Sequence, residues 1–81
     1  MPKFFINFLE SSGLVCTDDE GQDLPGLEAA EAAARMSARE ILANDVKYAS
    51  GTPLAAVTIT NQDGVELVRI AAKDILPDAL K

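Results

Sequence analysis

Four carboxylates close to one another are the residues of this chain best suited to chemistry. They lie within a six-residue stretch that a Pro-Gly pair follows, and they are Asp18, Asp19, Glu20 and Asp23. Carboxylate oxygens are the ligands that calcium and magnesium prefer, and a carboxylate can also serve as a general acid or base. The loop over residues 18–23 is therefore the candidate metal or catalytic site.

The spacing of these carboxylates does not fit a calcium-binding loop of the EF-hand type. Such a loop needs glycine at its sixth position and glutamate at its twelfth. Counting from Asp18 places Asp23 and Ala29 there, and counting back from Gly21 places Cys16 at the first position. A looser contact between two carboxylates and a divalent ion is left as the alternative. The favoured interpretation is a solvated loop near a helix N-terminus, where the helix dipole favours negative charge.

This interpretation has a measurable consequence for the loop. If its carboxylates only keep it soluble, we expect no metal site. We also expect that removing Asp18 and Asp19 together leaves the melting temperature nearly unchanged, with or without EDTA.

The remaining residues contain few groups that could catalyse a reaction. The chain has no histidine, so no imidazole can act as base or ligand. Its one cysteine, Cys16, falls within a strand pattern and is expected to be buried as a small hydrophobic residue. The motifs of phosphate-binding loops, dinucleotide-binding folds and nucleophile elbows are absent. The sequence thus predicts a protein that is not an enzyme and needs no cofactor.

Length and charge restrict the class of protein further. Eighty-one residues predict a single domain over residues 1–81. Seven basic residues are scattered among thirteen acidic ones, which argues against binding to nucleic acid or to anionic lipid. The longest apolar run, residues 54–57, is too short for a membrane span. With no visible signal peptide and no cysteine pair for a disulfide, we expect a cytoplasmic protein.

Hydrophobic periodicity predicts two hairpins separated by one long helix. A helix with Gly26 as its N-cap is expected over about residues 27–46, because this segment is rich in alanine and free of glycine and proline. Strands are expected over residues 3–10, 14–17, 54–60 and 65–70. The predicted fold is α+β: a two-layer sandwich of order ββαββ with a four-stranded antiparallel sheet in strand order 2-1-3-4. The long helix covers one face of this sheet.

The expected helix should pack on the sheet through small residues. At 100° per residue one stripe contains Leu27, Ala30, Ala34, Ala38 and Ile41, with Leu42 at its margin. The tail after the last strand carries Ile75, Leu76 and Leu80, and we expect it to cover an edge of the sheet.

The first strand carries large apolar side chains on both faces. Its two alternating sets are Phe4, Ile6 and Phe8 on one face and Phe5, Asn7 and Leu9 on the other. Because one helix covers only one face, the second set, with Val15 as a candidate member, predicts an apolar interaction surface. This surface could bind a protein partner or close a two-fold homodimer. The alternative is that the tail closes it.

Several segments resemble a known family of short proteins. They are the opening KFFIN, D-x-E-G at residues 18–21, Leu24-Pro25, LEAA at residues 27–30 and AREILA at residues 38–43. The family is an uncharacterised domain of unknown function that is frequent in rhizobia and related alphaproteobacteria. Its members often carry His near Ile6 and Asn7, and Asp in place of Gly26. The resemblance implies bacterial origin and supports the fold, and it implies no mechanism.

Two functions from different classes thus stay open. The leading one is a small, non-enzymatic interaction or regulatory module that acts through a sheet face or edge. The alternative is a metal-dependent or carboxylate-based catalytic protein that uses the loop over residues 18–23.

Overall fold

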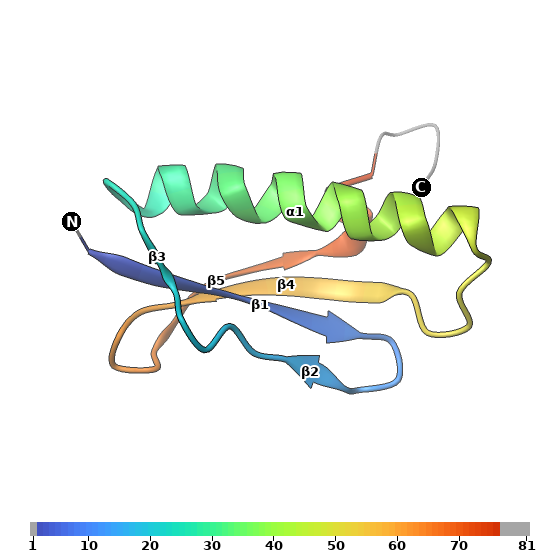
Figure 1. Cartoon of the computed structure of the whole chain (residues 1–81), viewed down its shortest axis with the longest axis horizontal. Helices are drawn as coiled ribbons and strands as arrows, with labels where there is room; N and C mark the ends of the chain where they lie inside the picture. The colour runs from blue at the N-terminus through green and yellow to red at the C-terminus, as the bar shows by residue number, and fades with distance from the viewer. Residues whose placement is uncertain (1, 77–81) are drawn as a thin grey trace.

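The computed structural model of the chain, which describes residues 2–76, has an α+β fold with one long helix and one antiparallel sheet (Figure 1). None of the helices in this range combines the length and apolar character that crossing a membrane requires. The elements in chain order are β1 (Lys3–Glu10), β2 (Val15–Cys16), β3 (Gln22–Asp23), α1 (Leu27–Lys47), β4 (Leu54–Thr60), β5 (Glu66–Ala71) and the 3₁₀ helix η1 (Ala72–Asp74).

The sheet is built around β1. Its strand order is β2-β1-β4-β5, every pairing is antiparallel, and β3 pairs with β1 as well. The predicted order ββαββ omitted β3. This strand has only two residues, too few to show a hydrophobic periodicity, and it forms only because the outer edge of β1 is free to pair. The second strand is also shorter than the predicted residues 14–17, since β2 contains only Val15–Cys16.

The core lies between α1 and the face of the sheet that carries Phe4 and Ile6. Both side chains are buried, and Val57 and Ile59 of β4 beside them are completely inaccessible to solvent. Large apolar groups on this face of the central strand are what a covering helix requires. The assignment of Phe4, Ile6 and Phe8 to one face is therefore confirmed, since Phe8 packs against the same core.

Helix α1 begins after Gly26, whose extended backbone accepts a hydrogen bond from the Ala30 N–H at 3.1 Å. Its buried residues lie at every fourth position and are Ala30, Ala34, Ala38 and Leu42. Four residues turn a helix by about 400°, so this line of contact drifts by about 40° per step. The line therefore crosses the sheet obliquely. The expected stripe was wrong at Leu27, which is exposed. Ile41 packs against the core as expected, although Leu42, placed at the margin of the stripe, is the more buried of the two.

The tail extends the core on the helix side of the sheet. Ile75 is buried there, Leu76 packs against the same cluster, and the Arg35 guanidinium donates a hydrogen bond to the Asp74 carbonyl at 3.4 Å. Ile75 and Leu76 consequently do not close the opposite face, which corrects the alternative that the tail covers Phe5. Leu80, the third residue of that expectation, lies outside the described residues.

The close approach of α1 to the sheet can be tested at Ala34, which is fully buried. We expect Ala34→Leu to destabilise the protein by about 1–3 kcal/mol, because a larger side chain overpacks the interface between helix and sheet. Ala32→Leu is the matched control, since Ala32 is exposed on the same helix. Urea unfolding of both variants measures the difference, and equal losses at the two positions would contradict the observed helix orientation.

Candidate functional site: the acidic loop and the helix-free sheet face

The acidic loop is a bulge in the chain that pairs with the outer edge of β1. Phe8 is paired with Cys16 and Phe4 with Gln22. Between these pairs, residues 5–7 of β1 lie opposite the five residues 17–21. β2 and β3 are therefore two parts of one interrupted edge strand, and the acidic loop joins them.

Asp18 closes the gap that this bulge leaves. Its Oδ1 accepts hydrogen bonds from the N–H groups of Gly21 at 3.0 Å and Glu20 at 3.2 Å. Its Oδ2 accepts a longer bond from the N–H of Ile6, on β1, at 3.4 Å. Backbone donors without a strand partner need an acceptor, and one carboxylate provides it for three of them. Asp18 is thus part of the scaffold of the sheet.

Asn7 holds the same loop from the helix-free face of the sheet. Its Oδ1 accepts a hydrogen bond from the Asp18 N–H at 3.0 Å. Its Nδ2 lies within hydrogen-bond distance of the Oγ1 atoms of Thr58 at 3.4 Å and Thr60 at 3.3 Å, both on β4. Only 8% of Asn7 is exposed. Asn7 therefore belongs to the interior of the protein, whereas the sequence placed it on the interaction surface with Phe5 and Leu9.

Gly21 brings the loop backbone against Phe5. Its φ is +75°, and a Cβ at this position would lie 2.9 Å from Cε1 of Phe5 and 2.7 Å from Cγ of Lys3. A side chain at position 21 would collide with both neighbours, so glycine is needed for the conformation and for the contact. The loop backbone is thus what covers part of the Phe5 ring, which is half-buried.

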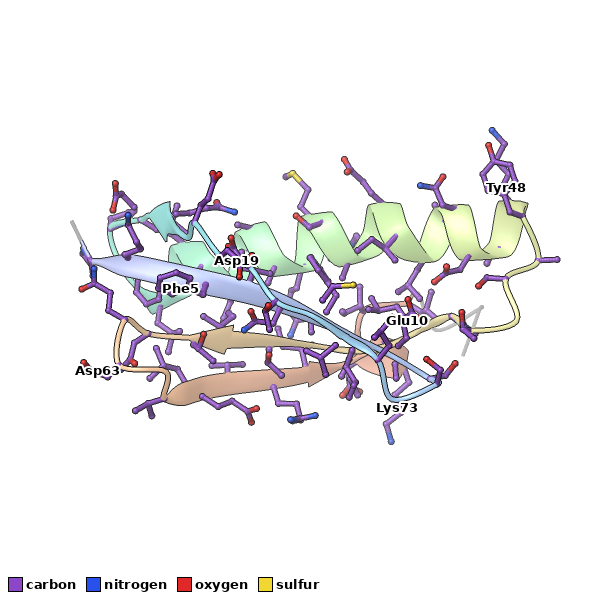
Figure 2. All side chains as sticks on the ribbon, turned by 60° about the horizontal axis from the view of Figure 1, so that its bottom comes forward. Phe5, Glu10, Asp19, Tyr48, Asp63 and Lys73 are labelled. Carbon is purple, nitrogen blue, oxygen red and sulfur yellow. The ribbon has the colours of Figure 1, made fainter. Side chains whose placement is uncertain are left out.

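The other three carboxylates of the loop do not share the role of Asp18. Asp19, Glu20 and Asp23 are exposed, and Asp19 is visible on the loop in Figure 2. Across residues 2–76, no three side chains of His, Cys, Asp or Glu come together in a way that could hold a metal ion. Because Asp18 accepts these hydrogen bonds, we no longer expect that removing Asp18 and Asp19 together leaves the stability of the protein nearly unchanged.

Cys16 lies at the surface, contrary to the prediction that it is buried. Its partner Phe8 is on the helix side of the sheet, so the Cys16 side chain is on that side too. Helix α1 packs mainly on β4 and β1 and leaves the edge strand β2 without cover. The sequence pattern could not show that Cys16 is exposed. Alternation indicates which face of the sheet a side chain lies on, but not how much of that face the helix covers.

The helix-free face carries an apolar row that runs across all four strands of the main sheet. Directly paired residues share a face, and Leu9 is paired with Val15 on one side and with Ala56 on the other. Ala56 in turn is paired with Ala71. We call Val15, Leu9, Ala56 and Ala71 the apolar row. Val15 is 50% exposed, Leu9 and Ala71 are half-buried, and Ala56 is buried.

The rows beside it carry mostly polar side chains, and Phe5 is the exception. The next one contains Asn7, Thr58 and Arg69, and the one after it contains Phe5, Thr60 and Glu66. Arg69 and Glu66 form an ion pair of 2.9 Å across these two rows. A shallow hollow lies where the rows meet, and its lining includes Leu9, Val15, Thr58 and both members of the ion pair.

Sequence reasoning found two of the four residues of the apolar row, Leu9 and Val15, and missed Ala56 and Ala71. Alanine gives no signal of its own on a strand, and the pairing of β1 with β4 joins residues about 50 positions apart. The missing signal is the register between β1 and β4, which no local turn sets.

Fold and site together define a small α+β protein whose acidic loop belongs to its scaffold and whose sheet has an apolar row on the face opposite the helix. Residues 3–73 match the model of a family described as "Domain of unknown function (DUF6894)". The chain therefore belongs to this family, and its resemblance to a domain of unknown function is confirmed. No curated protein and no solved structure matches the chain.

The scaffold role of Asp18 can be tested against that of Asp19. We expect Asp18→Ala to lower the free energy of unfolding by about 1–3 kcal/mol, because it leaves three backbone donors without their acceptor. Asp19→Ala, the control, should change it by less than about 0.5 kcal/mol, as is usual at an exposed position. Urea unfolding with and without EDTA measures both effects. Equal losses for the two variants, or a loss of native stability in EDTA, would contradict the assignment.

Proposed function

We propose that this domain is a non-enzymatic interaction module of the bacterial cytoplasm. In this proposal the fold acts as a two-layer sandwich, in which α1 covers one sheet face and the opposite face binds another protein. The apolar row provides the contact. The resemblance to a bacterial family supports the origin, and the acidic composition is consistent with a protein partner rather than nucleic acid.

The observation that carries the proposal is the apolar row itself. Four paired apolar residues cross the face that has no helix, and one of them, Val15, is half exposed although it is a β-branched hydrophobic residue. An apolar strip bordered by polar groups is typical of a protein–protein interface. The polar neighbours of the strip already have partners, because Asn7 and Thr58 lie within hydrogen-bond distance of each other and Arg69 pairs with Glu66.

The face is a better candidate than the edge of the sheet. The edge strand β5 carries the charged residues Glu66 and Arg69, and its pairing with β4 is irregular between Ile59 and Thr60. Charges and bulges are the features that prevent an edge strand from pairing with another chain. The acidic loop supports the interaction proposal rather than carboxylate chemistry, because Asp18 is occupied by backbone donors and its neighbours are dispersed in solvent.

The proposal is tested by affinity capture from the source cell with three baits. We expect Val15→Glu to lose the proteins that the native chain retains, a second copy of the chain included, because a charge in the apolar row opposes desolvation. Met36→Glu is the control: it adds the same charge to another exposed apolar residue, on α1. Circular dichroism verifies that both variants are folded. Identical capture by the native and Val15→Glu baits would overturn the proposed function.

A further inference from the structure

The sizes of the side chains in the apolar row are distributed unevenly across the sheet. The two large members, Val15 and Leu9, lie on β2 and β1, and the two small ones, Ala56 and Ala71, lie on β4 and β5. One half of the row is therefore raised and the other half is low. Protein interiors are close-packed, so a partner must place small side chains against the large ones of this row and large side chains against its small ones.

A second copy of the same chain has this shape. Rotation by half a turn about an axis parallel to the strands, between β1 and β4, places β1 over β4 of the second copy and β2 over β5. Leu9 then lies above Ala56 of the second copy, which is already buried within the single chain, so the accessible contact is the one between Val15 and the half-buried Ala71. Both contacts repeat in the other direction. A two-fold interface requires such self-complementarity, because one patch meets itself.

The charges of the face also favour a second copy. The register places Lys3 opposite Asp23, and Arg69 forms its ion pair with Glu66, so the charges on this face cancel while the whole chain carries −6. Two acidic chains can therefore meet here with little repulsion.

We propose that the partner of the helix-free face is a second copy of this chain, bound face to face with Leu9 and Val15 over Ala56 and Ala71. This inference rests on the proposed function and names its partner. Four strands spaced by about 4.8 Å and eight residues rising by about 3.3 Å give a face of about 500 Å². Two copies would bury about 1,000 Å² at most, the lower limit of specific interfaces, so we expect a weak and reversible dimer.

The test is sedimentation equilibrium from low to high micromolar concentration with a cycle of size-exchange variants. The native chain should show a monomer–dimer equilibrium. Val15→Ala should weaken it about tenfold, because a cavity opens over Ala71 in each of two contacts. Ala71→Val should weaken it similarly by crowding. The double variant exchanges large and small residues, and its association should return to within about threefold of the native value.

Three outcomes would overturn the inference. They are a native chain that is monomeric at every concentration, losses that add in the double variant, and a dimer that Met36→Glu dissociates while Val15→Glu does not. A monomeric chain whose capture of another protein depends on Val15 overturns the self-association alone and leaves the proposed function standing. Capture that is independent of Val15 overturns the proposed function as well.

Discussion

One helix lies on a sheet whose central strand is apolar on both faces, and the rest of the structure follows from that imbalance. Helix α1 and the tail residues Ile75 and Leu76 close the core over Phe4 and Ile6. Nothing equivalent among residues 2–76 closes the face that carries Phe5 and Leu9. The loop backbone at Gly21 shields Phe5, and the hydrogen bonds of Asn7 fill the middle of the face. The apolar row is the part of this face that neither the loop backbone nor the hydrogen bonds of Asn7 cover.

The residues that looked most chemical contribute to architecture instead. In the motif D-x-E-G, Asp18 accepts three backbone hydrogen bonds across the bulge, and Gly21 provides the conformation and the space that Phe5 requires. The exposed Asp19 and Glu20 sit on a turn that Asp18 holds in place. A carboxylate cluster in a sequence can therefore be a set of metal ligands, or it can contain the acceptor for the backbone N–H groups of an interrupted strand. Only the structure of the surrounding backbone distinguishes the two cases.

Much of the fold could be predicted because its signals are local. Alternation over β1, the alanine-rich run of α1 and the turn before β5 each lie within one segment. In that turn, Asn61 accepts hydrogen bonds from Asp63 and Val65. The short strand β3, the exposure of Cys16 and the role of Asp18 could not be predicted, because each depends on what pairs with the outer edge of β1. The candidate surface was predicted along β1, whereas the register of four strands turns it into a row across the sheet.

The central claim is that the helix-free face is where this protein meets another copy of itself, and its most direct test locates the contact residue by residue. Backbone amide spectra recorded by nuclear magnetic resonance over a dilution series report which residues change environment on association. The account predicts concentration-dependent shifts centred on Val15, Leu9, Ala56 and Ala71, with the outer face of α1 around Met36 unchanged. Shifts confined to α1, or spectra that do not change with concentration, would contradict it.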